Sequence, residues 1–338
     1  MLESLSATPF FWMAASSSSW AALLSVTLSH SLPLLLAGLG GLYSERSGIV
    51  NIGLEGMMLV GAFAAAWVGI AVGGSTGSHL LGLVMAGIAG GALATIHAVL
   101  CVQMRADQII SGVALNILAL QGTLFCSVVV FGSKGGSKSI SPIHDWKIFG
   151  LDLSPLLLLT LLLLGLTAFV LHRTAFGLRL RACGEHPSAA RSAGIAVSKM
   201  RFIAVIISGV LAGLGGAFLV HEAAGFTKDM SAGRGYIALA ALVFSGWRAV
   251  PLSLACLLFG FAYALNFQLQ NSGATLKSMP WLIGTPLQWF KTTFPVLFSF
   301  LQSSQFLSML PFLVTILALV GLVKKTRPPA ALGLEDSH

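Results

Sequence analysis

Two polar side chains stand four residues apart inside an apolar stretch in the first part of the chain. Asn51 and Glu55 fall within residues 44–58 (SERSGIVNIGLEGMM) and would share one face if residues 49–72 form a helix. A carboxylate in an apolar interior costs about 3 kcal/mol unless it is paired or faces water, so we expect Glu55 to face the inside of a helix bundle. Two interpretations stay open. Glu55 lines a polar pathway, or it locks two helices together by bonding to a backbone amide or a hydroxyl.

A second pair of polar residues opens the apolar stretch at residues 108–131. Asp107 is placed to cap a helix N-terminus, where its charge would meet the helix dipole. Asn116 lies about 13 Å further along such a helix, which rises 1.5 Å per residue. At that depth the amide of Asn116 needs a partner, which is either a neighbouring helix or a polar solute.

The side chains that enzymes use for catalysis do not gather in this sequence. The eight histidines are scattered, the four cysteines form no CxxC pair, and no GxxxxGK[ST] phosphate-binding loop is present. We therefore expect a chain that is not an enzyme and that binds no metal or cofactor of its own. The cysteines are interpreted as small buried side chains.

The composition is that of a membrane protein. Among 338 residues, 56% are hydrophobic and only 9% are charged, whereas globular proteins carry about a quarter charged residues. This excludes a soluble enzyme, a disordered chain and a disulfide-stapled secreted domain. The net charge of +8 is better explained by basic loops than by a nucleic-acid-binding face. We predict an all-α polytopic fold with residues 1–338 in a single transmembrane domain.

About 20 apolar residues are needed to cross a bilayer, and runs of that kind predict about nine spans, with a range of eight to ten. The predicted spans are residues 20–42, 49–72, 80–102, 108–131, 153–171, 202–220, 236–247, 250–267 and 306–323. With the C-terminal tail in the cytoplasm, twelve of the 19 Lys and Arg residues fall inside and seven outside. This bias has the sign that the positive-inside rule requires.

Three segments outside the spans are assigned by the same topology: a cytoplasmic loop at 172–201, an external or interfacial loop at 268–305, and a cytoplasmic tail at 324–338. In the first loop, Pro187 fits the first turn of a helix and Gly194 fits its C-terminal stop. Ala189, Ala190 and Ala193 give this short helix a small, smooth face. Such a helix suits a groove on a cytosolic partner, and the alternative is a solvated connector.

Residues 48–52 (GIVNI) show a weak internal sequence similarity to residues 235–239 (GYIAL). In the predicted topology the first enters from inside and the second from outside, as inverted repeats do. The span at 236–247 is also too short to cross alone. We therefore expect an inverted internal repeat with short or broken helices.

Four motifs resemble those of permease subunits of ABC importers in the ribose/branched-chain amino acid permease superfamily, nucleoside and simple-sugar branch. They are residues 45–56 (ERSGIVNIGLEG), 184–195 (GEHPSAARSAGI), 232–241 (AGRGYIALAA) and 328–333 (PPAALG). The resemblance covers roughly residues 32–333 and is closest to systems with basic-membrane-protein-type binding lipoproteins. It implies a permease in the bacterial inner membrane that pairs with a second, similar permease, with cytosolic ATPases that use ATP and Mg, and with an external binding lipoprotein.

The resemblance also assigns roles to residues. The motif at residues 184–195 would contain a coupling helix that docks into the ATPase. The residues assigned to this docking are Gly184, Glu185, Pro187, Ala189, Ala190 and Gly194. A nucleoside is the first expectation for the solute, with a simple sugar or riboflavin as alternatives. The pathway for such a solute would offer Asn51, Glu55, Asn116, Phe125 and Phe244. The rival hypothesis is an ion-coupled secondary transporter that uses Glu55 and Asp107 as proton or sodium sites.

Overall fold

The computed structural model describes residues 17–73, 76–133, 135–140, 146–148, 151–271, 293, 309, 313 and 327–333. The chain forms two compact units. The first contains residues 1–31, 145–153 and 257–322, and the second contains residues 32–144, 154–256 and 323–338. All of the site residues discussed below belong to the second unit.

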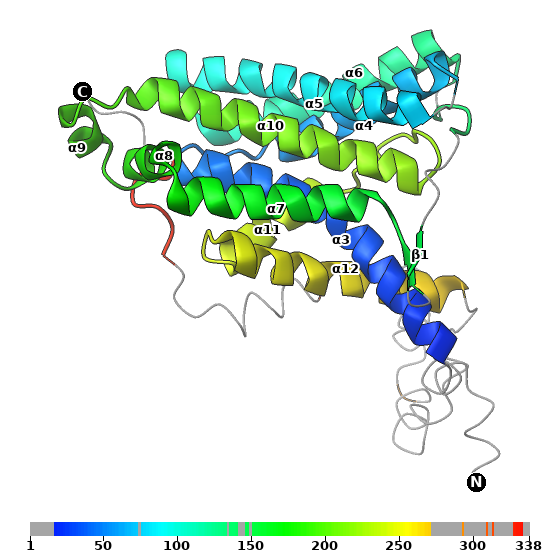
Figure 1. Cartoon of the computed structure of the whole chain (residues 1–338). Coiled ribbons are helices and arrows are strands. Elements are labelled where there is room, and N and C mark those ends of the chain that lie inside the picture. The colour runs from blue at the N-terminus through cyan, green and yellow to red at the C-terminus, as the bar shows by residue number, and fades with distance from the viewer. Residues whose placement is uncertain are drawn as a thin grey trace. The chain divides into compact units, whose positions relative to one another are not determined.

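The described residues are almost entirely helical (Figure 1). The helices are α3 (Ser17–Arg46), α4 (Leu54–Ala71), α5 (Thr76–Ala98), the π-helix η1 (Val99–Gln103), α6 (Gln108–Phe131), α7 (Leu156–Arg173), α8 (Ala175–Glu185), α9 (Pro187–Ser192), α10 (Val197–Glu222), α11 (Arg234–Phe244) and α12 (Ala249–Asn271). Two short strands, β1 (Trp146–Ile148) and β2 (Leu151–Leu153), pair as an antiparallel hairpin with Trp146 opposite Leu153.

Seven helices in the described part of the chain are long and apolar enough to cross a membrane. They confirm the polytopic all-α prediction, but not the number of nine spans. The predicted span at 236–247 corresponds to α11, which is shorter than a bilayer crossing requires. The predicted span at 306–323 lies outside the described residues, apart from two isolated positions.

The chain between α3 and α4 differs from the predicted helix. Residues 47–53 are not helical, and α4 begins only at Leu54. Asn51 therefore precedes the helix that carries Glu55, and the expectation that the two share one helix face is wrong. Gly48, whose φ is +99°, sits in this segment in a conformation that favours glycine. We call residues 47–53 the entrance segment.

The centre of the second unit is built from α4, α5 and α10, which make the most extensive contacts with one another. Glycines allow this close packing. A Cβ added to Gly61 of α4 would lie 2.8 Å from the carbonyl carbon of Gly213, and one added to Gly90 of α5 would lie 2.8 Å from the Cα of Gly213. Small residues at helix crossings are typical of membrane bundles. In lipid the hydrophobic effect does not drive helices together, so close van der Waals packing of the backbones does so instead.

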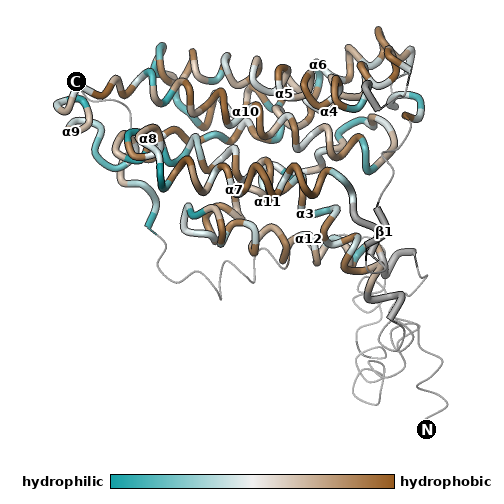
Figure 2. Tube along the Cα trace, viewed as in Figure 1, coloured by the Kyte–Doolittle hydropathy of each residue, from teal (hydrophilic) through white to brown (hydrophobic). Residues whose placement is uncertain are grey.

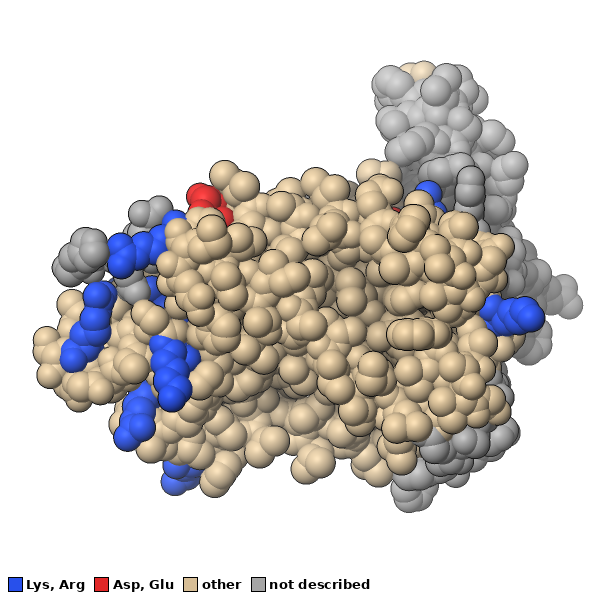
Figure 3. All heavy atoms as spheres, turned by 90° about the horizontal axis from the view of Figure 1, so that it is seen from above, with Lys and Arg blue, Asp and Glu red and all other residues tan. Residues whose placement is uncertain are grey.

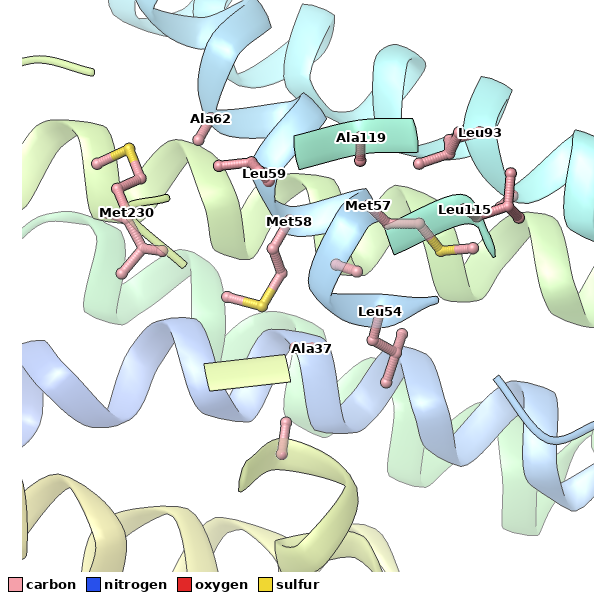
Figure 4. Packing of buried hydrophobic residues seen from close by; sticks show 14 of the residues in the cluster. Ala37, Leu54, Met57, Met58, Leu59, Ala62, Leu93, Leu115, Ala119 and Met230 are labelled. Atoms are coloured by element: carbon pink, nitrogen blue, oxygen red, sulfur yellow. The ribbon is translucent and has the colours of Figure 1, made fainter. Parts of the chain in front are cut away.

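Larger apolar side chains complete this core around the start of α4. Met57 and Met58 are fully buried in one cluster with Leu93 of α5 and Leu115 of α6. Figure 4 shows Met57 pointing toward Leu115. This packing fixes the position of the first turns of α4, where Glu55 lies.

The outer helices expose apolar surface instead. On α6 and α7 only 22% of the membrane-crossing window is buried, although both helices are strongly hydrophobic. Figure 2 shows hydrophobic residues along most of α7 and α10, and hydrophilic residues toward α8 and α9. A helix with apolar residues on its exposed face is suited to lipid or to another membrane protein.

Candidate functional site

The entrance segment is held by side chains from three helices. Val50 donates its backbone N–H to Gln108 Oε1 at 2.7 Å, and His97 Nε2 lies 3.3 Å from the Val50 carbonyl oxygen. Arg201 donates from Nε to the Ser47 carbonyl oxygen at 3.1 Å. A buried non-helical backbone needs such partners because unpaired N–H and C=O groups are costly inside a membrane protein. The segment is therefore a fixed, irregular entry to α4.

Asn51 lies at the centre of this segment and is fully buried. Its Nδ2 donates to Ser208 Oγ of α10 at 2.9 Å. Its Oδ1 has no hydrogen-bond partner among the described residues. A buried acceptor without a partner is rare in proteins, so this oxygen is an unsatisfied hydrogen-bond acceptor inside the bundle.

Glu55, in the first turn of α4, reaches the N-terminus of α11. Its Oε1 accepts the N–H of Gly233 at 2.7 Å, and its Oε2 accepts the N–H of Gly235 at 2.6 Å. Gly233 has a φ of +81°, and a Cβ on Gly235 would lie 2.6 Å from the Glu55 nitrogen. The positive ends of two helix dipoles thus converge on one carboxylate. The structure therefore contains the helix-locking contact that was one of the two interpretations of Glu55. The other interpretation, a role in a solute pathway, stays a prediction.

Asn116 of α6 bonds to the same region. Its Oδ1 accepts the N–H of Gly56 at 2.8 Å, and its Nδ2 donates to the Ile52 carbonyl oxygen at 3.0 Å and to Tyr236 Oη at 2.9 Å. The amide of Asn116 therefore joins α6, the entrance segment and α11. Asp107 caps α6 as predicted, because its Oδ1 accepts the N–H groups of Ile109 and Ile110.

The two predicted aromatic contacts do not join this cluster. Phe125 is 70% exposed on the outer face of α6, away from the buried face that carries Asn116. Phe244 is the last residue of α11, about 14 Å along the helix from the end that Glu55 caps. Sequence reasoning missed Tyr236, which lies within the 232–241 motif and is the aromatic side chain that bonds to Asn116.

A separate apolar cavity of about 550 Å³ lies between α3, α7, α8 and α10. Its lining includes Tyr43, Leu163, Thr167 and Val210. None of the predicted pathway residues line it, and its surface suits an apolar chain better than a hydroxyl-rich solute.

A second cluster surrounds the end of α3 and the loop of α8 and α9. Trp247 donates from Nε1 to Glu45 Oε2 at 2.5 Å, and Arg46 donates from Nε to the Trp247 carbonyl oxygen at 2.9 Å. Arg46 also pairs with Glu185 at 3.6 Å. A Cβ on Gly184 would lie 3.0 Å from the Arg46 carbonyl carbon, so this glycine permits the end of α8 to rest on the turn after α3.

The short helix predicted in the basic loop is α9. Pro187 occupies its first turn, and Gly194 follows its end with a φ of +79°. The structure separates the two neighbouring alanines. Ala189 is exposed, whereas Ala190 is 4% exposed and packs against Cys183 and Val197. The outward face of α9 is therefore formed by Ser188, Ala189, Arg191 and Ser192.

Basic side chains gather at the end of the second unit that carries α8 and α9. Figure 3 shows most of the visible Lys and Arg residues there. The exposed ones in this loop are Arg173, Arg179, Arg191 and Lys199. The arrangement supports the predicted cytoplasmic position of this end.

Comparison with known proteins places these features in a family. The profile described as "Branched-chain amino acid transport system / permease component" matches residues 23–319. The chain belongs to this family of permeases. It is 39% identical to the guanosine ABC transporter permease protein NupQ of Bacillus subtilis (strain 168), over 91% of this chain and 94% of the relative. It is also 33% identical to the nucleoside ABC transporter permease protein NupC of Lactococcus lactis subsp. cremoris, over 91% and 94% of the two chains.

A further relative is a putative glucose ABC transporter permease of Haloferax volcanii, which is 37% identical over 90% of this chain and 93% of the relative. No solved structure matches the permease significantly. The permease is a multi-pass inner-membrane protein and one component of a transport system. The recognised family is the one that the four sequence motifs indicated.

Proposed function

We propose that this permease is the membrane-spanning subunit of an ATP-driven ABC importer that moves a nucleoside into the cytoplasm. The observation that carries the proposal is the similarity, over nearly the full length, to permeases named for guanosine and nucleosides. Its partners would be a cytosolic ATPase, a second similar permease and an external binding lipoprotein. ATP and Mg would be used by the ATPase, since this chain has no phosphate-binding loop.

The polar cluster suits a neutral, hydroxyl-rich solute. Asn51 Oδ1 is a buried acceptor without a hydrogen-bond partner among the described residues, and Tyr236, which bonds to Asn116, is 46% exposed. An aromatic ring beside amide groups is a common way to bind a flat, polar ligand. Asn51, Asn116 and Tyr236 are therefore proposed to meet the solute, with Glu55 holding α11 in place.

A simple sugar is the second candidate, because the Haloferax volcanii relative is named for glucose. None of these three relatives is named for riboflavin. An ion-coupled mechanism fits the geometry less well. Both carboxylate oxygens of Glu55 already accept backbone N–H groups, and a cation would have to displace them.

The decisive test is uptake by proteoliposomes that contain the permease, its ATPase and its binding lipoprotein. We expect uptake of labelled guanosine that requires ATP, with much weaker uptake of glucose and riboflavin. Uptake that needs an ion gradient and no ATPase would refute the ABC mechanism. ATP-dependent uptake of glucose alone would keep the mechanism and change the solute.

The exposed alanine of α9 gives a test of ATPase docking. Ala189→Arg is expected to weaken binding to the ATPase by about 30-fold, because a buried hot-spot contact contributes about 2 kcal/mol. Co-purification of the two subunits measures this effect. Ser198→Arg is the matched control, since Ser198 is exposed in the first turn of α10, within the same cytoplasmic loop. Equal co-purification of both variants would contradict a docking role for α9.

A further inference from the structure

The end of the described chain is not a free tail. Residues 327–333 turn back onto the second unit, where Leu332 donates its N–H to the Pro329 carbonyl oxygen at 3.0 Å and Ala331 is 4% exposed. The described part of the predicted cytoplasmic tail at 324–338, residues 327–333, is therefore bonded to the rest of the second unit. We call residues 327–333 the clasp.

The clasp binds the end of α8 through two backbone N–H groups. Ala331 donates to the Gly184 carbonyl oxygen at 2.8 Å, and Ala330 donates to Glu185 Oε2 at 3.2 Å. Both acceptors lie directly before the His186–Pro187 step into α9. The clasp is therefore bonded to the chain two and three residues before Pro187, the first residue of α9.

The other end of the clasp binds the entrance segment. Gly333 donates its N–H to the Gly48 carbonyl oxygen at 3.1 Å. A Cβ on Gly48 would lie 3.2 Å from the Ala331 carbonyl oxygen, so this side of the entrance segment is in close contact with the clasp. Gly48 stands three residues before Asn51 and seven before Glu55.

The same two regions also touch directly, because a Cβ on Gly184 would lie 3.0 Å from the Arg46 carbonyl carbon and 3.3 Å from the Gly48 nitrogen. Arg46 and Glu185 pair at 3.6 Å, with the Glu185 side chain 45% exposed. Exposed ion pairs of this kind contribute little and are screened by salt. Two of the clasp hydrogen bonds, from Ala331 to Gly184 and from Gly333 to Gly48, join backbone groups on either side of the buried Ala331, and they add directional bonds to this contact.

We propose that the clasp is a transmission element, which fastens the α8–α9 loop to the entrance segment so that movement of α9 reaches Asn51 and Glu55. This inference rests on the proposed function, in which the ATPase moves α9. The clasp residues position other groups and touch no solute. Loss of the clasp should uncouple ATP hydrolysis from transport, while the permease and the ATPase should still assemble.

The test compares two deletions in the complete complex of permease, ATPase and binding lipoprotein. Deletion of residues 327–338 removes the clasp, and deletion of residues 334–338 leaves it intact. We expect the first deletion to reduce guanosine uptake per ATP hydrolysed by about tenfold, a typical size for lost coupling. The second deletion should match the unaltered protein, and both should co-purify with the ATPase.

A point variant separates coupling from folding. Ala331→Pro removes the N–H that Gly184 accepts and keeps the length of the chain. It should lower uptake per ATP hydrolysed in the same direction as the longer deletion. Unchanged coupling in both altered proteins would overturn the proposal. So would loss of co-purification with the ATPase in step with uptake, because the clasp would then serve assembly alone.

Hydrogen–deuterium exchange tests the clasp independently of the proposed function. Removing the clasp should speed amide exchange in residues 47–56, and removing residues 334–338 should not. Unchanged exchange would overturn the clasp even if uptake were ATP-driven. If the unaltered complex shows no ATP-driven uptake, the proposed function fails, and faster exchange would still support the clasp as the fastener of the entrance segment.

Discussion

Glu55→Gln is expected to lower the free energy of unfolding by about 2 kcal/mol and to impair uptake, because glutamine cannot replace both oxygens of the carboxylate. In the structure each oxygen accepts one N–H, from Gly233 and from Gly235. A glutamine side chain offers one acceptor and turns its NH₂ group toward the second N–H. It also removes the negative charge that faces the N-terminus of α11.

Thermal unfolding of the purified permease and solute uptake in proteoliposomes measure these two effects. Asp229→Asn makes the analogous chemical change at an exposed position in the turn before α11, where the positive φ of residue 229 also suits asparagine, and it should leave both measurements nearly unchanged. If Glu55→Gln unfolds at the temperature of the unaltered protein and transports at its rate, the carboxylate does not hold α11. Normal stability with impaired uptake would instead favour a direct role of the charge in the pathway.

Gly213→Ala is expected to destabilise the bundle by about 3 kcal/mol and to reduce the amount of folded protein in the membrane. The added methyl would lie 3.1 Å from the Ala86 carbonyl carbon and 3.2 Å from the Gly90 Cα, and it would clash with the Ala86 carbonyl oxygen. All of these neighbours are backbone atoms, so no side chain can rotate away. Relief would require α5 and α10 to separate.

The matched control is Gly165→Ala in α7, where no atom lies within 4 Å of the added methyl. Alanine there should be neutral or slightly stabilising, since it favours a helix by about 0.5–1 kcal/mol over glycine. The yield of each variant in membranes and its unfolding temperature measure the difference. Equal behaviour of the two variants would mean that the bundle core tolerates wider helix spacing than the structure has.

Much of the fold follows from hydropathy and local capping signals. The apolar runs predict the spanning helices, and Asp107, Pro187 and Gly194 mark helix ends that the structure confirms. The non-helical backbone at residues 49–53 was not predicted, because Ile49, Val50 and Ile52 are as apolar as the residues of a membrane helix. The Val50 N–H is bonded instead by Gln108, which lies in another helix. A tertiary partner of this kind leaves no periodic signal in the sequence.

The sequence indicated which polar residues form the candidate site, but it did not indicate their hydrogen-bond partners. A carboxylate and an amide at depth, Glu55 and Asn116, pointed to buried polar contacts, but their partners in α11 lie more than a hundred residues away. The outward position of Phe125 could not be predicted for a different reason. In a membrane protein, lipid-facing and core-facing positions are both apolar, so only the packing shows that this ring faces outward.

The packing of α4, α5 and α10 has a consequence for biosynthesis. The first two helices leave the ribosome together, but the helix that fills the groove between them is made only after α6 to α9 have followed. Until then Gly61 and Gly90 lack the backbone of Gly213 against which they pack in the folded protein. The core of the second unit can therefore be completed only after α10 has been synthesised.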